Sequence, residues 1–232
     1  MGRIKIMIEF LRFNRIKTYI FCCATYFLLG SVVLYLYPKG ELELLVNAKY
    51  MPVLDVFFKY WTHIGDGLFF TGVIIAMLFV SYYFCIVGTC IGLLHSAVIQ
   101  YLKLKVFDQS QRPFKFFKDV PDLNIHLVDG VEIYDYNSFP SGHTSTAFAM
   151  ITFIVLMLLI RFGKANPVIQ FTLFTIALLV GFSRIYLFQH FFIDTYFGSM
   201  IGIVCAFVVV YLFELTALKA KIGNRSIFHP KA

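Results

Sequence analysis

The stretch that decides the fold reads Ser183-Arg184-Ile185-Tyr186-Leu187-Phe188-Gln189-His190-Phe191-Phe192-Ile193-Asp194. It places an arginine, a histidine and an aspartate between two long apolar runs. Charged groups this close to hydrocarbon are energetically expensive, so they usually mark a working site. The alternative interpretation is a buried, salt-bridged trio that holds two helices together.

The spacing within this stretch indicates a particular chemistry. His190 and Asp194 are four residues apart, so they share one face if this part is helical. Asp194 can then accept a hydrogen bond from one ring nitrogen of His190, which leaves the other nitrogen free as a nucleophile. Arg184 offers a planar fork of donors that suits phosphate oxygens. The stretch therefore predicts a histidine nucleophile beside an anion-binding arginine.

The composition around this stretch indicates a membrane protein. Of 232 residues, 59% are hydrophobic and only 14% are charged, whereas soluble domains are about half apolar and a quarter charged. We expect one polytopic membrane domain over residues 1–232. The net charge of +7 does not indicate nucleic acid, because the basic residues lie mostly between and beyond apolar runs. There they signal orientation and contact anionic lipids.

The apolar runs predict an all-α fold with six transmembrane helices. A run of about 20 residues crosses the hydrocarbon, and the uncharged run at 67–102 is long enough for two spans that meet near Ser81-Tyr82. The predicted spans are residues 18–37, 67–81, 82–102, 143–160, 168–182 and 191–215.

The remaining segments are predicted to lie outside the hydrocarbon. Residues 1–17 form a basic amphipathic segment on the membrane surface, and residues 216–232 form a basic cytoplasmic tail. Residues 41–66 read as a helix in the interface. Residues 105–140 form the longest polar loop, with a small hairpin over 125–134 around Asp129-Gly130.

Two polar residues in the interfacial segment have two interpretations. His63 and Asp66 stand beside the turn signal Gly65-Asp66-Gly67. We expect them to serve as ordinary capping and turn residues, and a place at the substrate entrance is the alternative.

The lysines and arginines predict the orientation. Six spans put both termini on one side, and eleven of the twenty basic residues fall on that side. The positive-inside rule therefore favours cytoplasmic termini, which places the charged stretch at the extracytoplasmic face.

Two further motifs accompany the charged stretch in order along the chain. They are Lys105-x6-Arg112-Pro113 and Pro140-Ser141-Gly142-His143. With Ser183-Arg184-x5-His190-x3-Asp194 they resemble the three-part signature of the type 2 phosphatidic acid phosphatases, also called lipid phosphate phosphatases. Eleven specified residues match in order and spacing, and the apolar runs suit the membrane branch of that family.

The resemblance implies a role for each matching residue. His190 is the expected nucleophile, Asp194 its orienting carboxylate and His143 the acid that protonates the leaving alkoxide. The implied phosphate ligands are Lys105, Arg112, Ser141, Gly142 and Arg184. These roles agree with the residue chemistry, because phosphoryl transfer mainly needs the phosphate oxygens held and neutralised, and Gly142 opens a span helix where an anion can bind.

The sequence thus predicts a metal-independent membrane phosphatase that acts on a lipid phosphate and needs no cofactor. A lipid phosphotransferase on the same scaffold and a catalytically silent lipid-binding protein are the alternatives. Phosphatidate, phosphatidylglycerol phosphate, undecaprenyl diphosphate and phosphorylated lipid A are all open as substrates, and so is the oligomeric state. We expect a bacterial inner membrane, with the active site on the periplasmic side.

Overall fold

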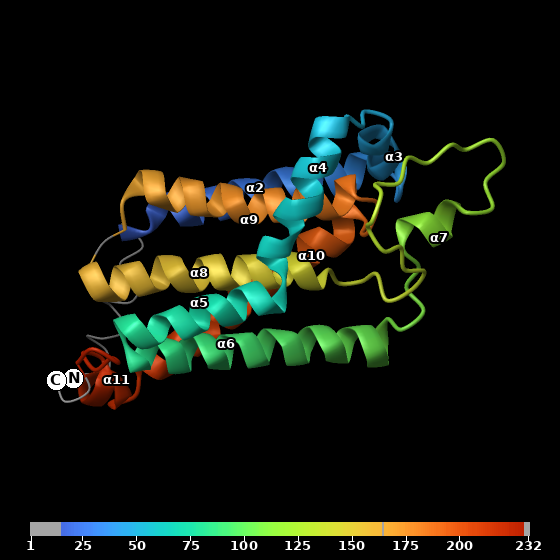
Figure 1. The fold of residues 1–232 in the computed structure, drawn as a ribbon. Coiled ribbons are helices and arrows are strands. Elements are labelled where there is room, and N and C mark those ends of the chain that lie inside the picture. The colour runs from blue at the N-terminus through green and yellow to red at the C-terminus, as the bar shows by residue number, and fades with distance from the viewer. Residues whose placement is uncertain (1–14, 164, 230–232) are drawn as a thin grey trace.

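The protein is all-α over residues 15–163 and 165–229, the ranges that our computed structural model describes (Figure 1). The elements are α2 (Lys17–Leu36), α3 (Glu41–Asn47), α4 (Pro52–Trp61), a 3₁₀ turn η2 (Thr62–Gly65), α5 (Gly67–Val80), α6 (Tyr82–Tyr101), a π-helical turn η3 (Leu102–Val106), α7 (Pro113–Phe117), α8 (Gly142–Phe162), α9 (Pro167–Tyr186), α10 (Phe192–Glu214) and α11 (Leu218–Ile222). No strand occurs in these ranges. The predicted amphipathic segment at 1–17 lies outside them, apart from its last three residues.

Five of the predicted spans are confirmed as helices long and apolar enough to cross a membrane. They are α2, α6 with η3, α8, α9 and α10. Local chemistry sets their ends: Asn166 accepts the amide of Val168 ahead of Pro167, and α8 stops at Gly163 with φ of 71°. Ser81 has extended backbone and separates α5 from α6, as predicted.

The second span differs from the prediction. α5 has 14 residues, a length of about 21 Å that is short of the roughly 30 Å hydrocarbon core. α4 and η2 precede it with a bend of 53° at Asp66, and the bent pair together meets the length of a span. The segment at 41–66 is therefore not one interfacial helix: α3 is separate, and α4 continues into the second span.

The predicted hairpin at 125–134 is a turn without strands. Gly130 has φ of 72°, and the amide of Val131 donates to Val128. The flanking backbone forms hydrogen bonds with other parts of the protein. The side chain of Asn47 bonds both the amide and the carbonyl of His126, and the side chain of Gln189 donates to the carbonyl of Glu132. These bonds replace a ladder across the hairpin.

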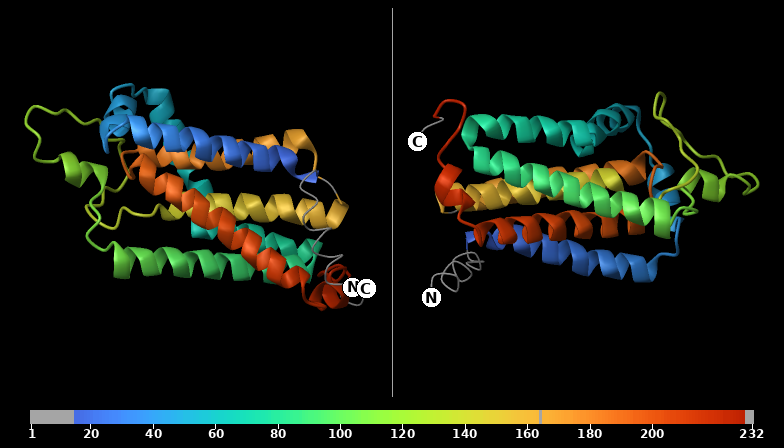
Figure 2. Two further views of the ribbon diagram at one scale, coloured as in Figure 1. Left: turned by 180° about the vertical axis from the view of Figure 1, so that it is seen from behind. Right: turned by 90° about the horizontal axis from the view of Figure 1, so that it is seen from below.

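α8 is the centre of the bundle. In its most apolar 18-residue window 67% of the residues are buried, against 17% for α2. α10 crosses it obliquely (Figure 2) and packs closely, because a Cβ at Gly198 would lie 2.6 Å from the carbonyl oxygen of Ser141 and one at Gly202 would meet the backbone of Ser145. Small residues spaced four apart let two membrane helices approach in this way. The contact brings the start of α10 against the start of α8.

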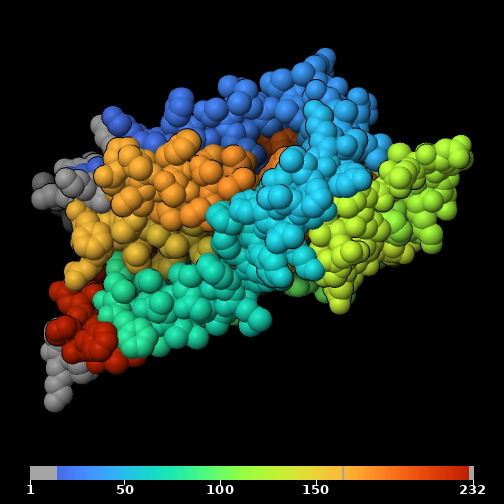
Figure 3. Space-filling model, turned by 45° about the horizontal axis from the view of Figure 1, so that its top comes forward, coloured from blue at the N-terminus to red at the C-terminus, as the bar shows by residue number. Residues whose placement is uncertain are grey.

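One end of the bundle carries the polar insertions. α3, α4, α7 and the loop between α7 and α8 gather there, whereas α11 lies at the opposite end (Figure 1). In Figure 3 the segment around α4 and the loop lie against each other at this end. His126 fixes this contact by stacking on Tyr50, with 3.7 Å between the ring centroids, and by bonding Asp55 through Nε2 at 2.9 Å.

Candidate functional site

His190, Asp194 and Ser138 meet in the bundle beneath the loop. His190 Nδ1 lies 3.4 Å from Asp194 Oδ2, and the Ser138 hydroxyl donates to the same oxygen at 2.5 Å. All three side chains are buried. Because Nδ1 faces the carboxylate, Nε2 is the ring nitrogen left for another partner. The sequence predicted the pair but not Ser138, whose only signal is its place two residues before the Pro140-Ser141 motif.

The start of α10 fixes the position of Asp194. Its carboxylate accepts the amide of Phe191 at 2.9 Å, and its carbonyl accepts the amide of Ser141 at 3.0 Å. The next amide, that of Phe192, donates to Glu43 at 2.6 Å. Burial raises the pKa of Glu43, and the hydrogen bond from Phe192 opposes this shift because it favours the carboxylate. The first turn of α10 is thus anchored to both α8 and α3.

Arg112 and Arg184 lie together although 71 residues separate them in the chain. The amide oxygen of Gln189 accepts from Arg112 at 3.1 Å and from Arg184 at 3.5 Å. Both arginines are buried, and neither forms an ion pair with a carboxylate within the described ranges. Arg184 Nε is buried with no hydrogen-bond partner there. Two buried cations around one neutral amide form a site that suits an anion.

The surroundings keep His190 neutral. Burial first, and then the positive charges of Arg112, Lys103 and Arg184, lower the pKa of His190 well below its ordinary value. His143 adds to this effect, so it lies within electrostatic reach of His190. A neutral imidazole has the free lone pair that a nucleophile requires.

The start of α8 supplies the Ser-Gly-His motif. Ser141 caps the helix, and its hydroxyl accepts the amide of Thr144 at 3.4 Å and bonds the Thr144 hydroxyl at 3.0 Å. Gly142 is the first residue of the helix. His143 is partly exposed, and its Nε2 lies 2.7 Å from Asp66 Oδ1. Asp66 is therefore more than a turn residue, because it contacts the predicted acid.

The structure brings Lys103 to this cluster in place of Lys105. Lys103 donates to the carbonyl of Asn137 at 2.8 Å, and its charge acts on His190. Lys105 is exposed. The two lysines are two residues apart in a helical segment, so they point to nearly opposite sides, and only one can face the bundle. The motif spacing alone cannot choose between them.

The loop covers Arg112 from outside. Arg112 Nε donates to the carbonyl of Tyr136 at 3.0 Å, and the ring of Tyr134 lies 5.2 Å from the guanidinium carbon. Tyr134 in turn donates to the carboxylate of Glu132. Residues 132–136 therefore form a roof over one side of the cluster.

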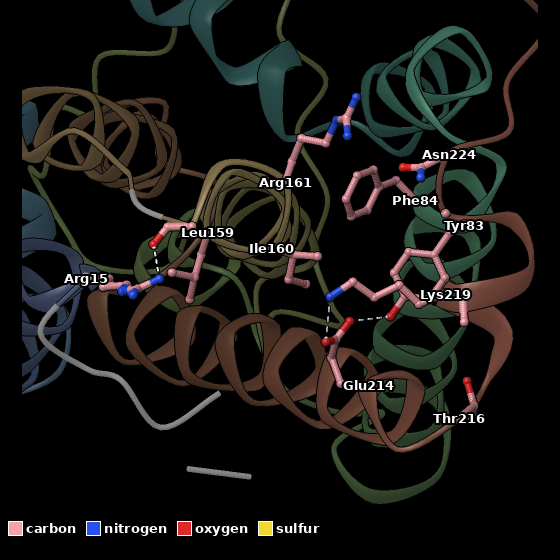
Figure 4. A pocket seen from close by; sticks show the side chains of 13 residues that line it. Arg15, Tyr83, Phe84, Leu159, Ile160, Arg161, Glu214, Thr216, Lys219 and Asn224 are labelled. Carbon is pink, nitrogen blue, oxygen red and sulfur yellow. Dashed lines mark hydrogen bonds and ion pairs between the residues drawn. The ribbon is translucent and has the colours of Figure 1, made fainter. Parts of the chain in front are cut away.

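A separate pocket lies at the opposite end of the bundle (Figure 4). Its volume is about 640 Å³, and Glu214 in its wall bonds Tyr83 at 2.8 Å and Lys219 at 2.9 Å. Arg15 donates to the carbonyl of Gly163 at 2.6 Å. None of the predicted site residues lines this pocket, so it is distinct from the cluster around His190.

Comparisons with known proteins show which family this chain is similar to. The family described as the PAP2 superfamily matches residues 78–216. "Probable lipid phosphate phosphatase 4" of Arabidopsis thaliana is 35% identical over 107 residues, which is 43% of this chain and only 35% of that protein.

Two solved structures are similar as well. The crystal structure of Aquifex aeolicus LpxE has a TM-score of 0.62 at 25% identity and covers 76% of this chain and 98% of that one. A transmembrane PAP2 type phosphatidylglycerolphosphate phosphatase from Bacillus subtilis has a TM-score of 0.56 at 21% identity, covering 87% and 96%. The second likeness concerns the fold alone.

Proposed function

The chain belongs to the PAP2 superfamily, and on that premise we propose that it hydrolyses the phosphate head group of a membrane lipid through a phosphohistidine at His190. We place the reaction at the periplasmic face of a bacterial inner membrane. The family relation supports a membrane lipid phosphatase. The nucleophile, the substrate and the sidedness are our own assignments.

The observation that carries the proposal is the pair of buried arginines beside a neutral histidine. Arg112 and Arg184 have no carboxylate partner in the described ranges, and Arg184 Nε has no hydrogen-bond partner there. Burial lowers the pKa of Arg112, so its charge is costly without an anion. A phosphoryl group satisfies both guanidinium groups and brings phosphorus toward His190.

In the first step His190 Nε2 attacks phosphorus, so a P–N bond forms and the bond to the lipid oxygen breaks. Asp194 accepts a hydrogen bond from Nδ1–H, which keeps its proton, and stabilises the cationic ring, while Ser138 holds Asp194. His143 gives its proton to the leaving alkoxide. Arg112, Arg184 and Lys103 neutralise the equatorial oxygens, a role we assign to Lys103 rather than to Lys105.

In the second step water attacks phosphorus and the P–N bond breaks. His143, now neutral, takes the proton from this water, and His190 leaves as the neutral imidazole. At the start of α8, Gly142 contributes its amide and Ser141 its hydroxyl to the phosphate. The inorganic phosphate then departs, and no metal ion or cofactor enters either step.

The test is phosphate release from purified protein against four lipids: phosphatidate, phosphatidylglycerol phosphate, undecaprenyl diphosphate and phosphorylated lipid A. A screen for phosphorylated acceptor alcohols in the same reactions detects phosphotransfer. We expect inorganic phosphate from at least one lipid. Its absence from all four, or recovery of the phosphoryl group only on acceptors, overturns the proposal.

The covalent step has its own test. In His143→Ala, an aryl phosphate with a good leaving group should still phosphorylate the protein, and slow hydrolysis should let the label accumulate. The label should be acid-labile and base-stable, and it should be absent from His190→Ala. Near-normal turnover by His190→Ala, or a label on Ser141, contradicts the mechanism.

A further inference from the structure

The bend in the second span contacts two separate residues of the site. η2 supplies Thr62, whose hydroxyl accepts from Arg184 at 2.7 Å. Immediately after η2, Asp66 contacts His143 through Oδ1 and His63 Nδ1 through Oδ2, at 2.7 and 2.6 Å. The three-part motif of the sequence contains neither Thr62 nor Asp66. One short turn thus reaches both an anion-binding arginine and the predicted acid.

Gly65, which has no side chain, lets this turn pack closely against α8 and α9. A Cβ on Gly65 would lie 2.7 Å from the carbonyl oxygen of His143 and 2.7 Å from Val180 Cγ1. Any larger residue forces the turn away from α8 and α9, because real Cβ contacts are not this close. Gly65 therefore fixes the distance between Asp66 and the first turn of α8.

We propose that Asp66 is a positioning residue for His143, which it orients and whose protonated form, needed to donate to the leaving alkoxide, its negative charge favours. This inference rests on the proposed function, because it assigns a partner to the acid of that reaction. The pair has the arrangement of a carboxylate that orients a catalytic imidazole. Both side chains are about one-third exposed, so the pair sits at the edge of the site that water and substrate reach.

The charges that face His143 make Asp66 decisive. Arg184 from α9 and Lys103 from the end of α6 act on His143 with positive charge, and His190 lies within electrostatic reach. Burial first, and then the positive charges of Arg184 and Lys103, favour the neutral imidazole of His143. Asp66 alone among them carries negative charge, and His63 shares its other oxygen. Without Asp66, the imidazolium loses the one negative charge that acts on it within the part of the chain that the structure describes, and its charged form is less favourable.

The experiment compares Asp66→Asn with Asp129→Asn, a matched change at an exposed aspartate whose backbone carbonyl accepts from Lys59. We measure kcat/KM against phosphatidate, a poor leaving group, and against p-nitrophenyl phosphate, a good one, across pH. For Asp66→Asn we expect a loss of about 10- to 100-fold with phosphatidate and about threefold or less with the aryl ester, since acid catalysis is worth about 10²–10⁴-fold in full. Asp129→Asn should match the wild type.

The pH profile separates this role from a structural one. With phosphatidate, the alkaline limb of Asp66→Asn should move to lower pH by about one unit, the scale of a single nearby charge. Asp66→Glu should restore part of the rate and should move the alkaline limb part of the way back to its wild-type pH. Equal losses on both substrates with an unmoved limb, or no loss, overturn the inference.

Failure of the proposed function can be distinguished from failure of this inference. If the wild type releases no phosphate from either substrate, the phosphatase assignment falls. The pair is then tested by ¹⁵N-histidine NMR, with the His143 signal identified from its loss in His143→Gln. That signal should titrate at higher pH in the wild type than in Asp66→Asn, and identical titrations refute the contact.

Discussion

Ser138→Ala tests whether the carboxylate that orients His190 needs its serine. The Ser138 hydroxyl donates to Asp194 Oδ2 at 2.5 Å and lies 3.5 Å from His190 Nδ1. The substitution removes one hydrogen bond from a carboxylate that keeps a second, from the amide of Phe191. Asp194 should then be held less firmly, and the imidazole with it.

The geometry bounds the magnitude. A distance of 2.5 Å falls in the short range of charge-assisted O–H···O⁻ bonds, which contribute about 1.5–3 kcal/mol. If the whole bond matters in the transition state, kcat falls about 10- to 150-fold, at about 1.4 kcal/mol per tenfold. The loss should stay below that of Asp194→Asn, for which about 10²–10⁴-fold is expected.

The assay is single-turnover phosphorylation of the protein by a labelled aryl phosphate in a His143→Ala background. Ser110→Ala is the control, because its hydroxyl accepts the amide of Phe139 at 3.0 Å in the same loop and does not bond Asp194. We expect the control to stay within about twofold of its parent. A rate for Ser138→Ala within twofold of the parent refutes the reasoning, and so does complete inactivation like that of His190→Ala, which would make Ser138 itself the reacting group.

Four further predictions concern the protonation of His190, the stability of the fold, the need for metal and the orientation in the membrane. Burial and the nearby cations lower the pKa of His190, so the rate of phosphohistidine formation should persist below pH 6.5. The rate is first corrected for the second ionisation of the substrate phosphate, near pH 6. A corrected rate that already falls with acid above pH 7 contradicts this prediction. His190 takes up a proton at higher pH in the unfolded chain than in the folded protein, so the free energy of unfolding should fall as pH drops below about 6.5. Chemical denaturation at several pH values measures this free energy. Turnover should survive excess chelator and be inhibited by vanadate, since cations already neutralise the phosphate; complete, metal-reversible loss refutes this. In a cysteine-free background, Asp129→Cys should react with a membrane-impermeant thiol reagent in intact cells and Arg161→Cys should not, and the reverse pattern inverts the proposed orientation.

Hydropathy and motif spacing together predicted most of the membrane architecture. Long uncharged runs have one low-energy solution in lipid, a helix that satisfies its own backbone, so five spans agree with their predicted ranges. The spacing of His190 and Asp194 is likewise local information, and they are in contact at 3.4 Å as predicted, although His190 precedes the helix that begins at Phe192. The prediction of a hairpin at 125–134 was wrong, because the partners of that backbone come from α3 and from the turn between α9 and α10.

The sequence by itself therefore determined five of the spans, the order of the motifs and the charged pair, because each depends on residues close in the chain. Only the tertiary structure decided that Lys103 faces the cluster and Lys105 does not, since packing sets the rotation of a helix end. It also decided the places of Ser138 and Asp66. Their partners lie 56 and 77 residues away, and no local pattern encodes a contact that arises from the close packing of α10 and of the bent second span against α8.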